Sequence, residues 1–218
     1  MTTYYTLAAS LPPLPYSFDS GPLPITRKTL RKRLELLDDD DHALMNQVIE
    51  FFAWDRQVLD STDKSVLEKH QQLIEASPNA LVREIVRHRF EVRTIVASLR
   101  RKRDGETVPT GYPPLVQLIR RNWDAVNFNL GPRFQWIDPF INACENGRLA
   151  EAQHVLFTDL WTTWSRLEQR YHFTFESILL YVARWEIVER WTSQDAAHGR
   201  ERFEELIRET LGEYAERF

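Results

Sequence analysis

The sequence predicts an all-α protein. Nearly every periodic segment of the 218 residues repeats its apolar positions with the period of an α-helix. Only 7 glycines occur, which is few for the turns of a β-sandwich or the phosphate loops of a nucleotide-binding α/β fold. Apolar residues make up 43% of the chain, so the predicted helices carry enough apolar side chains to bury a sizeable core.

The first 25 residues are predicted to form a short element followed by an extended strap. The segment "YYTLAASL" (4–11) could be a short strand or a helical turn, because so few residues do not separate the two. The Pro-rich stretch "PPLPYSFDSGPLP" cannot lie inside a regular helix. It is interpreted as a strap lying over the protein. Its expected anchors are Leu14, Tyr16, Phe18 and Leu23.

Four helices are predicted in the first lobe, residues 26–104. Thr26 is a suitable N-cap for the first helix. The carboxylates of "DDDD" suit the N-terminus of the second, where they complement the helix dipole. Pro78 ends the third helix, and the fourth is long and bears an apolar stripe. The predicted ranges are about 26–37, 38–54, 62–76 and 79–103.

A second helical lobe is predicted over residues 114–218. The segment "DGETVPTGYPP" holds two Gly and three Pro, so residues 105–113 are interpreted as a linker between the lobes, although both lobes could also pack as one domain. The helix after Thr174 is apolar on most of its circumference and is expected at the centre of its lobe. The predicted ranges are about 114–126, 138–145, 149–171, 175–191 and 195–214.

The two lobes share a short sequence pattern. When "IVRHRFEVRTIV" (85–96) is set under "LYVARWEIVERW" (180–191), Arg, an aromatic residue, Glu and an aliphatic residue coincide. The pattern suggests two related helical lobes, and chance is the alternative. A carboxylate on an apolar helix is costly to bury without a cation. Glu91, Glu186 and Arg190 are therefore candidates for structural ion pairs, with ordinary surface pairs as the alternative.

No catalytic, cofactor or metal site is predicted. Consecutive carboxylates on a helix point about 100° apart, so "DDDD" does not converge on one ion. The six histidines form no HxxxH pair, the phosphate-loop motifs are missing, and Cys144 is the single cysteine. A helical enzyme whose site is assembled from distant residues, around His88, Glu91 and Glu186, remains the alternative.

A basic run is the main candidate for partner binding. Eight Lys or Arg and two acids lie between Arg83 and Arg103. The last four cations complement the C-terminal end of the helix dipole, which would be their structural role. Because the net charge is −4, docking on an acidic protein surface is favoured over nucleic-acid binding, which stays as an alternative. The candidates are Arg100, Arg101, Lys102 and Arg103, together with Trp136 in a predicted loop.

Three stretches carry a family resemblance: "YYTLAASLPPL", "FEVRTIVASLRRKRDG" and "FTFESILLYVARWEIVERW". Together they resemble DUF2764, a family encoded in bacterial V-type ATPase operons. The middle stretch is also similar to the "E-x-x-N-L-R-x-I-L-R-A-K" pattern of the C subunit of V/A-type ATPases, whose eukaryotic counterpart is the d subunit. The Asn position of that pattern holds Arg93 or Thr94 here, so Arg93 joins the partner-binding candidates.

The resemblance implies an all-helical adaptor built from related lobes. The C subunit of those ATPases sits on the membrane rotor ring, receives the central shaft and performs no chemistry. We therefore expect a non-enzymatic subunit or assembly factor without cofactors, with the rotor ring and the central shaft as partners. The expected location is cytoplasmic and peripheral to the inner membrane through the complex. No apolar run approaches the roughly 20 residues of a membrane span, and no signal peptide is expected.

Overall fold

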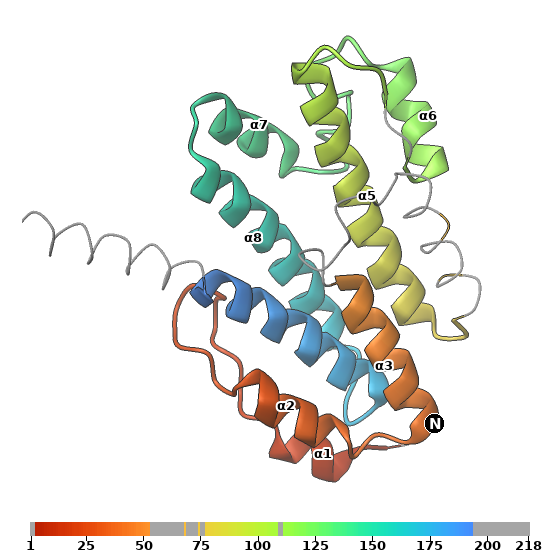
Figure 1. The fold of residues 1–218 in the computed structure, drawn as a ribbon, viewed down its shortest axis with the longest axis vertical. Helices are drawn as coiled ribbons and strands as arrows, with labels where there is room; N and C mark the ends of the chain where they lie inside the picture. Colours follow the sequence, from red (N-terminus) through yellow and green to blue (C-terminus); the bar gives the residue numbers. More distant parts are fainter. Residues whose placement is uncertain (1–2, 53–67, 69–73, 75–76, 109–110, 194–218) are drawn as a thin grey trace, which may run out of the picture. The chain divides into compact units, whose positions relative to one another are not determined.

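A computed structural model describes residues 3–52, 68, 74, 77–108 and 111–193. Every regular element among these residues is a helix and none is a strand, which confirms the predicted all-α class (Figure 1). A further helix, called here the 175–193 helix, follows the labelled ones. The labelled helices are α1 (Tyr5–Ser10), α2 (Arg27–Leu34), α3 (Asp39–Phe52), α5 (Ala80–Arg103), α6 (Pro113–Arg121), α7 (Ile137–Glu145) and α8 (Leu149–Glu168).

The predicted elements agree with these helices in order and position where the structure describes them. The ambiguous segment at residues 4–11 is helical, as α1. The predicted helix at 195–214 lies outside the described residues, and so does the one at 62–76 apart from residues 68 and 74, which are helical.

Two compact units make up the chain. Unit 1 comprises residues 1–36 and 160–218, and unit 2 comprises residues 37–159, so the boundary falls within α8. This division is not the one drawn from the sequence at residues 105–113. The reason is that α6 packs on α5, with Leu115 and Ile119 buried in the same core as Val92 and Ile95.

Helix ends in unit 2 follow local capping chemistry. The Asn79 Oδ1 accepts hydrogen bonds from the main-chain N–H groups of Leu81, at 3.0 Å, and Val82, at 3.2 Å, and so starts α5. Gly105, with φ at 74°, takes the left-handed conformation just past its last turn. Asp38 accepts from the N–H of Asp41 at 2.9 Å. The acidic run thus forms the N-terminal end of α3, as the sequence predicts.

One close approach fixes the segment between α5 and α6. A Cβ atom on Gly111 would lie 2.6 Å from the side chain of Thr94, which is 2% exposed. The Thr94 hydroxyl also accepts a hydrogen bond from the N–H of Tyr112 at 3.1 Å. Glycine is therefore required here for space rather than for a special φ angle.

The 175–193 helix forms the centre of unit 1, as its nearly continuous apolar surface predicts. Its apolar side chains are almost fully buried; they include Ile178, Leu179, Leu180, Val182, Ala183 and Val188. The N-terminal elements α1, the strap and α2 all belong to the same unit, although they lie far from this helix in the sequence. Figure 1 shows α1 and α2, in red and orange, beside this helix, in blue.

Aromatic side chains of unit 1 hold the strap in place by donating hydrogen bonds to the main-chain carbonyl groups of the strap. The Tyr181 hydroxyl donates to the carbonyl of Pro12 at 2.8 Å, and the Trp185 indole donates to that of Ile25 at 2.9 Å. The Trp161 indole donates to the carbonyl of Tyr16 at 3.3 Å. An extended segment has no hydrogen-bond ladder of its own, so these donors satisfy carbonyl groups that would otherwise lack partners.

The side chains of the strap behave only partly as expected. Phe18 is 2% exposed, and its ring meets the Trp161 and Trp191 rings at centroid distances of 6.1 and 5.4 Å. Tyr16, by contrast, is 98% exposed, so the prediction that its ring anchors the strap is wrong. Its carbonyl group makes the contact instead. Leu14 and Leu23 are half-buried.

Candidate functional site

Most of the basic cluster at the end of α5 is engaged inside unit 2. Lys102 Nζ donates to the carbonyl of Ala125 at 2.6 Å and lies 5.3 Å from the centre of the Phe128 ring. Arg101 and Arg103 make ion pairs with neighbouring acids, with Glu106 at 3.7 Å and with Asp104 at 2.9 Å. Arg100 is exposed and makes no ion pair with any described residue. Local contacts and the helix dipole thus account for much of this cluster.

Trp136 is not an exposed loop residue, which corrects the expectation that it touches a partner. It is 5% exposed and stands at the N-cap position of α7. Its ring packs edge-on against Phe134 and Phe140, at centroid distances of 6.4 and 5.8 Å. The segment before α7 turns back into the core of unit 2, where Phe128 and Leu130 are also buried, so an irregular backbone here does not mean an exposed side chain.

Two of the predicted ion-pair candidates have arginine partners that are distant in sequence. Glu91 is 5% exposed, and its Oε1 accepts a hydrogen bond from Arg133 Nη2 at 2.6 Å. Arg133 also lies 4.9 Å from the centre of the Phe134 ring. Arg93, on the same helix as Glu91, is half-buried and interacts within the protein. Arg133 therefore compensates a carboxylate that is buried in the middle of α5.

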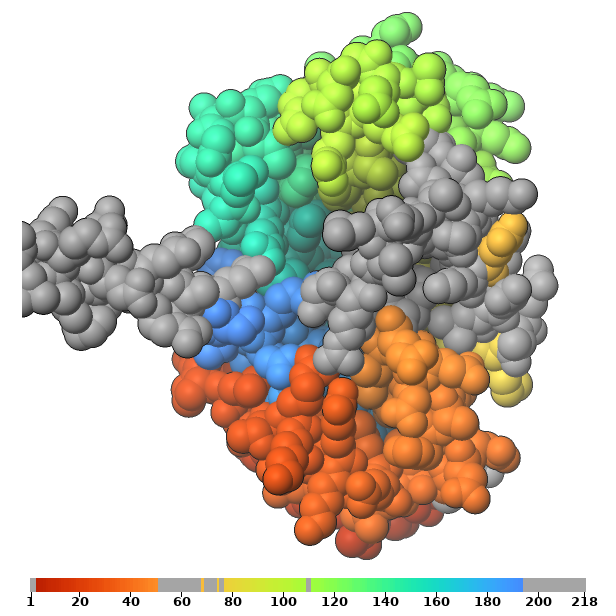
Figure 2. All heavy atoms as spheres, viewed as in Figure 1, coloured from red at the N-terminus to blue at the C-terminus, as the bar shows by residue number. Residues whose placement is uncertain are grey.

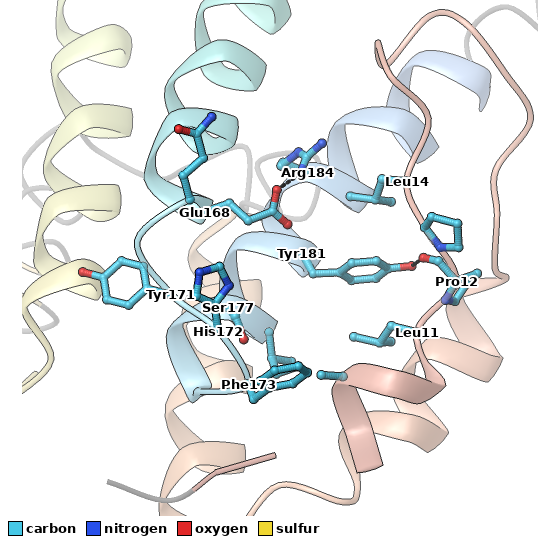
Figure 3. Close-up of a pocket in the computed structure, with 14 residues that line it drawn as sticks. Leu11, Pro12, Leu14, Glu168, Tyr171, His172, Phe173, Ser177, Tyr181 and Arg184 are labelled. Carbon is cyan, nitrogen blue, oxygen red and sulfur yellow. Dashed lines mark hydrogen bonds and ion pairs between the residues drawn. The ribbon is translucent and has the colours of Figure 1, made fainter. Parts of the chain in front are cut away.

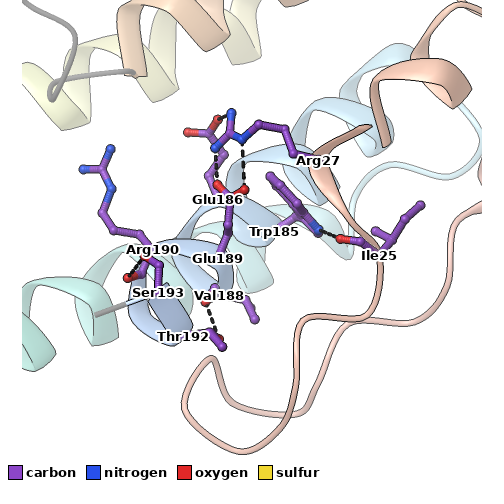
Figure 4. Close-up of polar contacts among 9 residues, drawn as sticks. All are labelled: Ile25, Arg27, Trp185, Glu186, Val188, Glu189, Arg190, Thr192 and Ser193. Carbon is purple, nitrogen blue, oxygen red and sulfur yellow. Dashed lines mark hydrogen bonds and ion pairs between the residues drawn. The ribbon is translucent and has the colours of Figure 1, made fainter. Parts of the chain in front are cut away.

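In unit 1, Glu186 pairs with Arg27, a partner that the sequence did not indicate. Arg27 Nη1 lies 3.5 Å from Glu186 Oε1, and Arg27 Nε donates to Glu189 Oε1 at 2.9 Å (Figure 4). A second contact joins Arg27 Nη2 to Glu189 Oε2, so the pair is bidentate. The guanidinium also lies 5.2 Å from the centre of the Trp185 ring. The carbonyl of Arg190 accepts from the Ser193 hydroxyl at 2.9 Å.

The residues of the alternative enzyme hypothesis each have a different partner. His88 Nε2 lies 3.1 Å from Asp159 Oδ2, Glu91 bonds to Arg133, and Glu186 pairs with Arg27. His88 and Glu91 belong to unit 2 and Glu186 to unit 1. In the part of the chain that the structure describes, no group of three or more His, Cys, Asp or Glu side chains could hold a metal ion.

Unit 1 contains a pocket of about 540 Å³ that the sequence did not indicate (Figure 3). α1 and the strap form one side of it, and the C-terminal end of α8 and the start of the 175–193 helix form the other. Its lining is mostly apolar and aromatic, with one ion pair. The lining residues include Leu11, Pro12, Leu14, Glu168, Tyr171, His172, Phe173, Ser177, Tyr181 and Arg184.

The ion pair in this pocket joins a largely buried arginine, Arg184, to a more exposed glutamate, Glu168. The Arg184 side chain is 11% exposed and that of Glu168 37%, and Arg184 Nη1 contacts Glu168 Oε2. The guanidinium also lies 4.4 Å from the centre of the Trp161 ring. Burial lowers the pKa of Arg184, and the Glu168 carboxylate opposes that shift. Glu168 therefore compensates a cation that is costly to bury alone.

Phe173 forms an exposed and strained wall of the pocket. Its φ angle is 59°, in the left-handed region that bulky residues avoid, and the residue is 45% exposed. The ring lies 4.8 Å from that of Tyr5, and the carbonyl of Phe173 accepts from the N–H of Tyr4 at 2.6 Å. These contacts hold an aromatic ring at the surface in a conformation that the backbone alone disfavours.

Most of the chain matches a family model. Residues 53–213 match the family described as "Protein of unknown function (DUF2764)". The chain belongs to the DUF2764 family. Two of the three stretches that resemble DUF2764, the middle and the C-terminal one, fall inside the matched residues, whereas "YYTLAASLPPL" lies before them. No curated protein and no solved structure gives a significant match to this DUF2764 protein.

No helix among the described residues of this DUF2764 protein is long and apolar enough to cross a membrane.

Alkaline pH should weaken the attachment of the strap to unit 1, because the Tyr181 hydroxyl that donates to the strap then loses its proton. Burial raises the pKa of Tyr181 to about 12, above its ordinary value, while Arg33 and Arg184 act in the opposite direction. The folded state therefore holds this proton more tightly than the unfolded state. The resulting stability is fully present below about pH 10 and is lost as the pH rises from about 10 to about 12.

We expect the urea midpoint of the wild-type protein to fall over this pH range, and Tyr181→Phe to show a smaller fall. Tyr16→Phe is the matched control, because Tyr16 is 98% exposed. Equal alkaline losses for wild type and Tyr181→Phe would show that the Tyr181 hydroxyl does not contribute.

Proposed function

We propose that this DUF2764 protein is a non-enzymatic helical subunit or assembly adaptor of a bacterial V-type ATPase. The family match over residues 53–213 carries the proposal, because the sequence resemblance connects DUF2764 with V-type ATPase operons. By the same resemblance, it would couple the rotor ring to the central shaft as the C subunit of V/A-type ATPases does. It would then act in the cytoplasm and reach the membrane only through the complex.

The arrangement of charges in each unit supports an adaptor role. An adaptor that transmits force needs helices that keep their positions, and an ion pair between two elements favours one arrangement of those elements. In unit 2, Glu91 and Arg133 join α5 to the segment before α7. In unit 1, Arg27 joins α2 to the 175–193 helix. These contacts suit a scaffold whose shape is maintained under load.

A native pull-down tests the proposal directly. The full chain carrying a C-terminal tag is expressed in the source cells, recovered at low salt and examined by mass spectrometry. We expect catalytic, shaft and ring subunits of the V-type ATPase to be recovered together with the chain. An unrelated tagged helical protein is the control. If no ATPase subunit is enriched over that control, the proposal is wrong.

Nucleic-acid binding is the second candidate, and the exposed cations at the end of α5 favour it. Arg100 is exposed, and the side chain of Arg103 is 70% exposed. Retention on nucleic acid should then weaken with salt and be lost in R100S/R101S/R103S. Lys102 is left unchanged because it bonds to the carbonyl of Ala125. Equal retention of wild type and variant would exclude this cluster as the binding site.

A further inference from the structure

Helix α2 carries positive charge that the fold does not use. Its sequence, RKTLRKRL, has five cations and no acid. Two of these cations are engaged within unit 1, since Arg27 pairs with Glu189 and Glu186 and Arg33 donates to the carbonyl of Ser10. The other three, Lys28, Arg31 and Lys32, are exposed and make no hydrogen bond or ion pair with any described residue.

These three cations lie on one face of α2. Their spacing of three and four residues brings them together on the helix surface, where like charges repel. Lys28 also stands in the first turn, where a cation opposes the helix dipole. Arg31 and Lys32 stand in the last turn of α2, where cations complement the dipole, as the cations at the end of α5 do. The α5 cluster differs because two of its cations make ion pairs with acids beside them. The helix dipole therefore favours Arg31 and Lys32, but it explains neither Lys28 nor the repulsion among the three cations.

Unit 1 holds this face in a fixed orientation. Leu30 and Leu34, on the opposite side of α2, are each 3% exposed. The Thr26 hydroxyl caps the helix by accepting from the N–H of Thr29 at 3.3 Å. Arg27 attaches the first turn to the 175–193 helix, as Figure 4 shows. A partner would thus meet cations on a helix that is already ordered, which lowers the entropic cost of binding.

An exposed leucine follows the cationic helix. Leu36 is 54% exposed and lies in the turn just after the end of α2, four residues after Lys32. Atoms of α2, in red-orange, form part of the molecular surface in Figure 2. An apolar contact beside a group of cations is typical of a protein interface, in which an apolar anchor is bordered by charged residues. It contributes nothing to contacts with phosphate groups, which dominate nucleic-acid binding.

We propose that Lys28, Arg31 and Lys32, with Leu36 beside them, form a docking site for an acidic protein surface on the V-type ATPase. The inference rests on the proposed function, and it locates the contact on α2 rather than at the end of α5. Charge complementarity selects the partner: three uncompensated cations on a protein of net charge −4 match a local group of carboxylates. An extended anionic polymer or membrane would also meet the acidic remainder of the chain.

The test measures binding of the full chain to purified V-type ATPase from the source cells, after a salt wash has removed endogenous chain. We expect K28S/R31S/K32S to bind at least about 10-fold more weakly than wild type at low salt, and the difference to shrink as salt screens the charges. K28R/K32R should bind as wild type does. The matched control R87S/R120S/R121S removes three other exposed arginines and should change the affinity less than about 2-fold.

Each outcome decides between the sites. If wild type does not bind the ATPase, the proposed function and this inference both fail. If wild type and K28S/R31S/K32S bind equally, or only R100S/R101S/R103S loses affinity, the ATPase role stands and the α2 site is wrong. The same variants are tested on phosphatidylglycerol vesicles and on a short RNA duplex. If the chain bound the vesicles or the RNA more tightly than it binds the ATPase, and if that binding depended on Lys28, Arg31 and Lys32, the assignment to a protein partner would be overturned. Circular dichroism melts confirm that each variant is folded.

Discussion

Replacing Trp185 by alanine should lower the free energy of unfolding by about 3–5 kcal/mol. The residue is 1% exposed at the centre of unit 1, so the change leaves a cavity that the neighbouring side chains fill only in part. It also removes the indole donor to the carbonyl of Ile25 and the ring beneath the Arg27 guanidinium. Urea unfolding followed by circular dichroism measures the loss.

Two further variants separate the causes. Trp185→Phe keeps an aromatic ring but removes the indole donor, and we expect it to cost about 1–3 kcal/mol. Tyr16→Ala changes a side chain that is 98% exposed and should alter stability by less than about 0.5 kcal/mol. If Trp185→Ala were as stable as Tyr16→Ala, then Trp185 would not lie in a packed core, and the 175–193 helix would not be the centre of unit 1.

Removing the Glu168 carboxylate should also destabilise unit 1. Glu168→Ala leaves the Arg184 guanidinium buried without the anion that compensates it. Breaking a fully buried pair in this way costs about 3–5 kcal/mol, and because the Glu168 side chain is 37% exposed we expect a loss nearer about 2 kcal/mol. Thermal and urea unfolding both measure it.

The surface pair of Arg148 and Glu151 is the matched control. These two side chains are 49% and 51% exposed, so Glu151→Ala should cost less than about 0.5 kcal/mol. The double variant E168L/R184M replaces both charges with apolar groups and should recover much of the stability lost in Glu168→Ala. Equal losses for Glu168→Ala and Glu151→Ala would show that burial of Arg184 has no energetic effect.

Local patterns in the sequence determine where the described helices begin and end. Thr26 caps α2 as predicted, and Asn79 caps α5 at the predicted start of that helix, because a cap needs only a side-chain oxygen next to the first N–H groups of a helix. The apolar period places Ile85 and Ile95 in the core. These properties depend on residues within one or two turns of each other, so they can be read from a single sequence.

The candidate sites were less predictable. The cations of α2 are visible in the sequence, but only the structure distinguishes Arg27 and Arg33, which have partners, from Lys28, Arg31 and Lys32. The pocket of unit 1 could not be anticipated, since its lining comes from residues 8–14 and from residues 168–184. The strained φ angle of Phe173 has no sequence signal, because the residue is neither glycine nor asparagine.

By itself, the sequence determined that this DUF2764 protein is helical, where most of its described helices lie and which of their faces are apolar. The tertiary structure decided which of those faces meet. It joins Arg27 to Glu189 and residues 1–36 to the chain after residue 159, places α6 on α5, and buries Trp136. Helix formation depends on neighbours in the chain, whereas burial and ion pairing depend on contacts between segments that the chain order does not specify.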